Sequence, residues 1–356
     1  MDYVYRFPVV RGIQAGSEYY IAMVPLKMLS KLFSTDEGEY IPPEYRAQRR
    51  LNGSRIPVII KYILDNRENY VFSALAASID GEFEFKNNKT NDDTGILEIS
   101  MDAHFLINDG QHRKSAIMAA LKEDKSLENE TISIVFYADK GLERSQQIFT
   151  DLNKNAVKTS NSISELYDSR DEMAVITRNV IWNNDFLNIY TDKERDILGK
   201  YSSSLFTLNT FYIANKTIVG RTIKKDTEKF LLKYWNNVVE HMVQWQELQH
   251  REITKVDLRE SYIATQSIVI QALGRIGNYY ISHQSEMKGG LQGLERINWS
   301  RSAKQWYMRA IGKTGRIITS KKAAVLISNV IKKELEIALS AEEINAEKAL
   351  KKTIED

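Results

Sequence analysis

The sequence predicts an α+β protein, with a mixed α/β domain over residues 1–160 and an all-helical domain over residues 161–356. All five prolines lie within the first 57 residues, where short apolar segments alternate with polar turns. Beyond about residue 165, apolar residues recur every three to four positions, which is the period of an amphipathic helix. A chain of 356 residues is also longer than a single core usually serves, which favours two domains.

In the first domain we expect short strands, each an apolar run bounded by polar residues or glycine. Helices are expected over residues 55–64, where Pro57 suits the first turn, and over residues 112–122. The segment 86–94 is rich in Asn and Asp, which favours a loop. The expected strands cover residues 19–24, 71–75, 95–99, 105–107 and 132–137.

In the second domain, three stripes of apolar residues predict the buried faces of helices. Thr319 or Ser320 suits the cap of the last of these helices. Residues beyond about 340 are rich in Glu, Lys and Ala and predict one further helix. The stripes run from Phe230 to Met242, from Ile263 to Ile276 and from Ala324 to Ala338.

The composition is that of a soluble globular protein, with 43% hydrophobic and 27% charged residues. No window approaches the roughly 18 consecutive apolar residues that a membrane span requires. The first residues also lack the layout of a signal peptide, so we expect a cytoplasmic protein with no membrane partner. The absence of cysteine excludes disulfides and cysteine nucleophiles, and the five histidines have no tight ligand spacing, so no metal site is expected.

The strongest functional signal is a turn between a predicted strand and a predicted helix, Asp109-Gly110-Gln111-His112-Arg113-Lys114-Ser115. Gly110 allows a tight turn, and the first amides of the following helix attract anions. Arg113 and Lys114 add positive charge, Ser115 adds a hydroxyl, and Asp109 could cap the helix or hold a cation. These groups could hold a nucleoside triphosphate or a DNA phosphate. The spacing alone fits an ordinary turn before a solvated helix start equally well.

The Asp-Gly-Gln-His-Arg motif resembles the signature of the DGQHR-domain family, and the surrounding chain is similar to the DndB family, which regulates gene clusters for DNA phosphorothioation. The likeness covers most of residues 1–160. It extends over Arg46-Ala47-Gln48-Arg49, Arg55-Ile56-Pro57 to Tyr62-Ile63-Leu64, Tyr70-Val71-Phe72-Ser73-Ala74-Leu75, Ser78-Ile79-Asp80-Gly81-Glu82 and Ile148-Phe149-Thr150-Asp151-Leu152-Asn153.

This resemblance implies a nucleotide at the turn. Gly110-x-x-Arg113-x-x-Ala116 is similar to the phosphate-binding motif of the ParB/sulfiredoxin superfamily, where it contacts CTP or ATP. ATP or another nucleoside triphosphate with Mg²⁺ is therefore the expected cofactor. Sulfiredoxins carry a reactive cysteine where this chain has Gln111, so their reductase chemistry is excluded. The expected phosphate-binding residues are Gly110, Gln111, His112, Arg113, Lys114, Ser115, Asn153, Arg49 and Arg55.

Hydrolysis of such a nucleotide would need a group that orients water or a metal ion beside the phosphates. Asp109 and Asp151 are the catalytic candidates. In this hypothesis Asp109 positions Mg²⁺ or water, and Arg113 neutralises the developing charge. The alternative is that Asp151 and Asn153 only cap and brace the turn.

The segment 296–333 contains no acidic residue, although the whole chain has a net charge of only +2. Its lysines and arginines predict salt-dependent contacts to DNA phosphates, unless they pair with acids elsewhere. Trp299 and Trp306 fit either base stacking or a buried core. A second basic run, from Arg46 to Arg55, could reach DNA or the triphosphate. The DNA-binding candidates are Arg296, Arg301, Lys304, Arg309, Lys313, Arg316, Lys321 and Lys322.

The leading hypothesis is a repressor that binds double-stranded DNA at the promoter of a phosphorothioation gene cluster, with an affinity tuned by nucleotide. We expect such a protein to act as a homo-oligomer. The alternative is a nucleotide hydrolase that also nicks DNA. A third hypothesis is a non-enzymatic scaffold for other phosphorothioation proteins.

Overall fold

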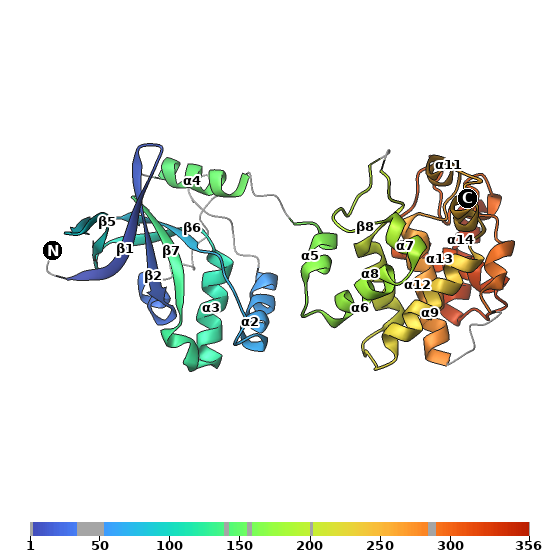
Figure 1. The fold of residues 1–356 in the computed structure, drawn as a ribbon, viewed down its shortest axis with the longest axis horizontal. Coiled ribbons are helices and arrows are strands. Elements are labelled where there is room, and N and C mark those ends of the chain that lie inside the picture. The colour runs from blue at the N-terminus through green and yellow to red at the C-terminus, as the bar shows by residue number, and fades with distance from the viewer. Residues whose placement is uncertain are drawn as a thin grey trace. The chain divides into compact units, whose positions relative to one another are not determined.

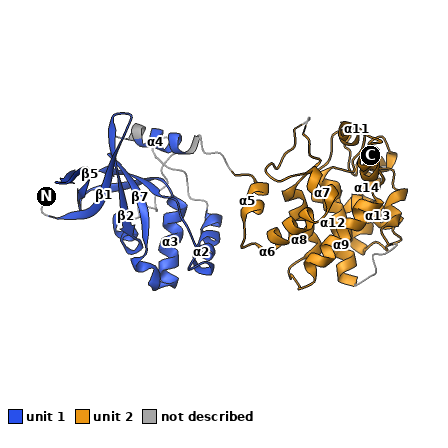
Figure 2. Cartoon of the chain, in the orientation of Figure 1, with its two compact units in different colours: residues 1–157 blue, residues 158–356 orange. Residues whose placement is uncertain are grey.

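The computed structural model describes residues 3–33, 53–138, 142–154, 159–199, 202–283 and 290–355. The chain forms two units, Met1–Val157 and Lys158–Asp356 (Figure 2), and each is described by itself. A mixed sheet with helices forms the first unit, and helices dominate the second, so the predicted order of the two classes is confirmed.

A seven-stranded sheet with the order β4-β5-β1-β2-β7-β3-β6 is the centre of the first unit (Figure 1). Neighbouring strands are antiparallel except β3 and β7, which are parallel. Ala22 of β2 lies opposite Val9 of β1 and Ile134 of β7, and all three are buried. The strands are β1 (Val4–Gln14), β2 (Ser17–Pro25), β3 (Leu75–Asp80), β4 (Phe83–Asn88), β5 (Asn91–Ser100), β6 (His104–Asp109) and β7 (Thr131–Ala138).

Helices cover both faces of this sheet. On one face lie α1 (Leu29–Leu32), α2 (Ile56–Asp65) and α3 (Gln111–Glu123), whose apolar residues join the core formed by the inward side chains of the strands. Side chains alternate along a strand, so Ser78 points to the opposite face from Ala77. There the Ser145 hydroxyl of α4 (Leu142–Lys154) donates to Ser78 Oγ at 3.3 Å.

The structure confirms the predicted helices of this unit and four of the five predicted strands, but three expectations differ. Residues 86–94 are not a loop, because β4 and β5 pair across most of them. β4 is the edge strand, and backbone hydrogen bonds to β5 hold it although most of its side chains are exposed. Its polar sequence therefore did not predict a strand. Residues 71–74 are not in a strand, since β3 begins at Leu75. β1 was not predicted.

The second unit is helical apart from a short parallel pair, β8 (Thr191–Asp192) and β9 (Phe206–Thr207), which the sequence did not predict. Trp235 and Trp245 lie fully buried in its core. Ser320 caps α13, as expected, since its Oγ accepts the Ala323 amide at 3.2 Å. The helices are α5 (Asn161–Tyr167), α6 (Glu172–Trp182), α7 (Asp185–Tyr190), α8 (Leu208–Val219), α9 (Thr227–His241), α10 (Val243–Gln249), α11 (Lys255–Ser261), α12 (Ser267–His283), α13 (Lys321–Glu334) and α14 (Ala341–Glu355).

Among the residues that the structure describes, no helix combines the length and the hydropathy that crossing a membrane would require.

Candidate functional site

The turn singled out by the sequence joins β6 directly to α3. Asp109 ends the strand, Gln111 begins the helix, and Gly110 between them has φ +99°. A Cβ at position 110 would lie 2.3 Å from Leu75 Cδ2, so the turn requires glycine for both its conformation and its space. The first amides of α3 have no partner within the helix, because only from Lys114 onward does an amide reach a carbonyl four residues back.

Arg113 ties this turn to the segment before β3. Its Nη1 donates to the carbonyl oxygens of Ser73 at 2.6 Å and Ala74 at 2.9 Å. Its Nη2 donates to Asp109 Oδ2 at 2.5 Å, and the Arg113 side chain is only 17% exposed. Asp109 therefore does not cap α3. Arg113 acts first as a positioning residue, which holds Asp109 and the turn in place.

A cleft of about 240 Å³ opens beside this turn. Six residues predicted as functional meet in it: Arg55, Asp109, Gly110, Gln111, His112 and Arg113. Asn108, Ile59 and Phe149 complete the lining. Arg55 is exposed and has no acidic partner within the described ranges, so its charge is available to an anion in the cleft.

Other predicted residues lie away from this cleft or outside the described residues. Lys114 and Ser115 belong to α3, but neither lines the cleft. Asp151 lies exposed on α4, where its Oδ1 accepts from Gln147 Nε2 at 2.6 Å. Arg49 and the side chain of Asn153 are outside the described residues.

The hydrolase hypothesis therefore keeps one carboxylate at the cleft. Asp109 is the one acidic residue of its lining, and one of its oxygens is bound by Arg113. Mg²⁺ in nucleotide sites is usually held by one or two carboxylates together with the phosphates, so Asp109 could supply the ligand only in part. The amides, Gln111 and Arg55 fit a phosphate group better than they fit a metal-assisted attack.

The electrostatics of the cleft favour the neutral form of its histidine. Burial, and then the nearby Arg55 guanidinium, lower the pKa of His112 below its ordinary value, although Asp109 acts in the opposite direction. At neutral pH the imidazole can therefore donate one hydrogen bond and accept another. A bound phosphate would reverse the effect of Arg55 and favour the charged imidazolium.

Asn108 is a cleft residue that the sequence reasoning missed. It is 2% exposed, and its Oδ1 accepts from Ser78 Oγ at 2.9 Å. Its Nδ2 donates to the Ser145 carbonyl at 3.4 Å, so one side chain links β3, β6 and α4. This linkage positions α4 and, with it, Phe149 at the cleft wall. The available signal was an amide directly after the apolar residues Phe105 to Ile107 of the strand.

The predicted DNA-binding segment presents most of its cations on loops and a helix start of the second unit. The turn at Gly312 closes with the Gly312 amide donating to the Arg316 carbonyl at 2.9 Å. Within the ranges described, five of the predicted cations are exposed and have no acidic partner: Lys304, Lys313, Arg316, Lys321 and Lys322. The last two are the first residues of α13, where the positive end of the helix dipole adds to the potential.

The other predicted cations have partners or are partly buried. Arg309 Nη1 and Nη2 each lie 2.5 Å from a carboxylate oxygen of Glu347 on α14. Arg296 pairs with Glu334 at 3.5 Å, and Arg301 is half-buried. The ion pair occupies both terminal nitrogens of Arg309, so Arg309 is not a candidate for contact with DNA.

Trp299 and Trp306 belong to the core. They are 1% and 0% exposed, and their rings stack on each other with centroids 5.4 Å apart. Trp306 Nε1 donates to the Asn298 carbonyl at 2.7 Å. The alternative of a buried core is therefore confirmed, and base stacking by these two residues is excluded. They do not share a helix, since this stretch is loop and short 3₁₀ turn.

Comparison with known proteins adds one finding. A sequence model of the family described as "DndB: DNA-sulfur modification-associated" matches residues 7–338. This match covers nearly all of both units, including the cleft and the basic segment. No significant match was found among curated proteins or among solved structures.

Proposed function

The chain belongs to the DndB family of DNA-sulfur modification-associated proteins, and on that premise we propose that it is a DNA-binding transcriptional repressor of a phosphorothioation gene cluster. Membership gives the chain a role in DNA phosphorothioation. The repressor activity, the DNA contacts and the nucleotide are the parts that we propose.

One observation carries the proposal of DNA binding. Five exposed cations, from Lys304 to Lys322, have no acidic partner in the described part of the chain, and no acidic residue occurs between Glu295 and Glu334. Cations without an acidic partner are surrounded by water and counterions, and a polyanion such as DNA can take the place of both. Release of the ions condensed on DNA then drives binding. The same residues carry no code for bases, so the segment supplies affinity rather than operator choice.

We further propose that nucleotide bound in the cleft at Gly110 tunes this affinity. The supporting geometry is the start of α3 with its helix dipole, the exposed Arg55 and the His112 imidazole around one cleft. The terminal phosphates of ATP or CTP are the groups that such donors would recognise. A difference in DNA affinity with and without nucleotide would then measure the coupling between the two units.

A gel shift tests the repressor proposal. The full chain is titrated against the promoter of its own gene cluster and against random DNA of equal length, with and without ATP or CTP. We expect tighter binding to the promoter, and an Arg55→Gln/His112→Gln variant that still binds DNA but no longer responds to nucleotide. Equal affinity for both DNAs would contradict the repressor. Release of phosphate from ATP that Asp109→Ala abolishes would support the hydrolase instead.

A further inference from the structure

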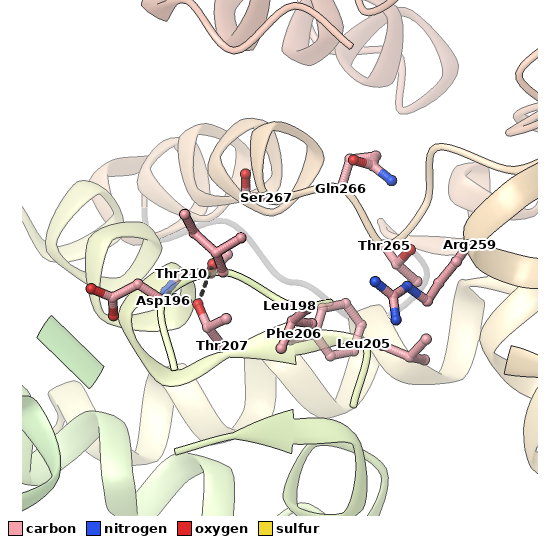
Figure 3. A pocket seen from close by; sticks show the side chains of 11 residues that line it. Asp196, Leu198, Leu205, Phe206, Thr207, Thr210, Arg259, Thr265, Gln266 and Ser267 are labelled. Carbon is pink, nitrogen blue, oxygen red and sulfur yellow. Dashed lines mark hydrogen bonds between the residues drawn. The ribbon is translucent and has the colours of Figure 1, made fainter. Parts of the chain in front are cut away.

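The helical unit contains a cavity of about 290 Å³ that is separate from the cleft at Gly110 (Figure 3). It lies where α8 and α12, two helices that pack against each other, both begin. Leu205 and Phe206 of the segment that leads into α8 form an apolar wall, and Arg259 of α11 reaches in from another side. Thr207, Thr210, Thr265, Gln266 and Ser267 supply polar groups.

Thr265 is the observation that points to a ligand. Its side chain is only 6% exposed and lines the cavity, yet its hydroxyl makes no hydrogen bond to any residue that the structure describes. The hydroxyl oxygen is not one of the described polar atoms that are sealed from solvent without a partner, so it remains accessible to a molecule in the cavity. A ligand in the cavity would provide the missing acceptor.

A second buried donor comes from a pair of hydroxyls. Thr207 and Thr210 are 5% and 9% exposed, and their Oγ1 atoms are hydrogen-bonded at 2.9 Å, as the dashed line in Figure 3 shows. The pair has two hydroxyl hydrogens, and the bond between them uses one. The other hydrogen remains available to an acceptor in the cavity.

The charge of the cavity favours an anion. Arg259 Nη2 donates to the Gly199 carbonyl at 2.9 Å and Nη1 lies 3.4 Å from the Ser202 carbonyl, which leaves three of its five donors. The starts of α8 and α12 add partial positive charge. Asp196 is the one acidic residue of the lining, and its two oxygens accept the amides of Asn161 and Ser162, both at 2.8 Å. The Asp196 carboxylate thus interacts mainly with the amides at the start of α5.

We propose that this cavity binds the phosphate group of a small phosphorylated molecule. Arg259, Thr265 and the first amides of α12 would surround the phosphate, and Leu205 and Phe206 would contact the organic part. Because Thr207, Thr210 and Thr265 are nearly buried, a terminal phosphate on a small molecule reaches these donors more readily than the internal phosphodiester of a DNA backbone does. The helical unit then carries a receptor site for a small effector in addition to its basic segment.

Calorimetric titration of the full chain with inorganic phosphate and with AMP tests this site. Two variants remove its donors: Thr265→Val, which keeps the shape of the side chain, and Arg259→Gln. Matched controls are Thr217→Val on α8 and Lys255→Gln on α11, neither of which lines the cavity. We expect each donor variant to weaken binding by about tenfold or more, since hydrogen bonds to charged groups are among the stronger ones. Neither control should change the affinity.

The background of Arg55→Gln/His112→Gln separates this site from the cleft at Gly110. Binding that survives in this background and is lost in Thr265→Val supports the proposal, whatever the fate of the cleft. Absence of saturable binding of both probes would overturn it. Binding that Thr265→Val and Arg259→Gln leave unchanged would also overturn it. So would a site that binds a short DNA duplex but neither AMP nor inorganic phosphate.

Discussion

Replacing Gly110 with alanine should selectively destabilise the first unit. The residue has φ +99°, and a Cβ there would lie 2.3 Å from Leu75 Cδ2 and 3.3 Å from Arg113 Nη2. The left-handed backbone costs a side chain about 1–2 kcal/mol, and forcing one carbon into a packed site typically costs about 1–3 kcal/mol. We therefore expect the free energy of unfolding to fall by about 2–5 kcal/mol.

A matched glycine separates the two contributions. Gly16 lies in the same unit with φ +71°, but a Cβ there would meet nothing within 4 Å. Gly16→Ala should therefore cost only the backbone strain of about 1–2 kcal/mol. Adding Leu75→Ala to Gly110→Ala removes the clashing methyl. In a double-mutant cycle, the double variant should therefore lose less stability than the sum of the losses in the two single variants.

The assay must distinguish the two units, and the distribution of tryptophan allows this. All five tryptophans lie at or beyond residue 182, so their fluorescence in urea reports the second unit. Hydrogen exchange of the β6 and α3 peptides reports the first. We expect exchange to accelerate in Gly110→Ala while the fluorescence transition stays in place. A loss of stability no greater than that of Gly16→Ala would refute the close contact with Leu75.

The remaining predictions concern charged groups. Arg309→Met should cost about 3–5 kcal/mol of unfolding free energy, because it leaves the buried Glu347 carboxylate with no cationic partner and only the hydrogen bond from Asn329 Nδ2. Arg309→Met/Glu347→Leu should recover most of this loss, and fluorescence-detected urea unfolding measures both variants. Arg55→Gln should raise the pKa of His112, followed by NMR titration of the ring, because one of the two causes that lower it is removed; an unchanged pKa would show that burial alone acts. Burial, with Asp196 and Asp171 nearby, raises the pKa of Glu165 from 4.5 to about 8. The folded state therefore holds a proton that the unfolded state has lost, and stability should fall between pH 4.5 and 8 by at most about 1.4 kcal/mol per pH unit. Glu165→Gln should flatten that slope, and an equally steep slope in this variant would contradict the assignment.

Much of the fold could be predicted because its signals are local. Apolar runs and a helical period identify β2, β7, α9 and α12, whose side chains face a core. β4 escaped prediction because it lies at the edge of the sheet, where pairing of the backbone rather than burial holds the strand. The prediction for residues 71–74 was wrong in the opposite sense, because a strand was expected there and none forms. The apolar run there predicts a strand, but Arg113, 40 positions away from Ser73, takes the carbonyl oxygens instead.

The turn of the candidate site could be predicted from the sequence, but several of the other residues that line the cleft could not. The glycine, the helix start and the basic residues are contiguous in sequence, so their chemistry was visible. Arg55 was predicted to reach the phosphates and does line the cleft, whereas Ile59 and Phe149 come from other elements and meet the turn only through packing. Arg309 shows the same limit for the basic segment, because its partner Glu347 is 38 positions away and no pattern connects them. Which cations pair and which remain open is a tertiary property.

The salt dependence of DNA binding tests the central claim most directly. Fluorescence anisotropy with promoter DNA would compare the wild-type chain with Lys313→Gln/Arg316→Gln/Lys321→Gln/Lys322→Gln, and with Lys224→Gln/Lys225→Gln as an exposed basic control in the same unit. Each lost phosphate contact should reduce the slope of log K against log salt by roughly 0.9, so the quadruple variant should lose up to about 3.6 and the control little. Equal slopes for the wild type and the quadruple variant would contradict the assignment of this segment to DNA.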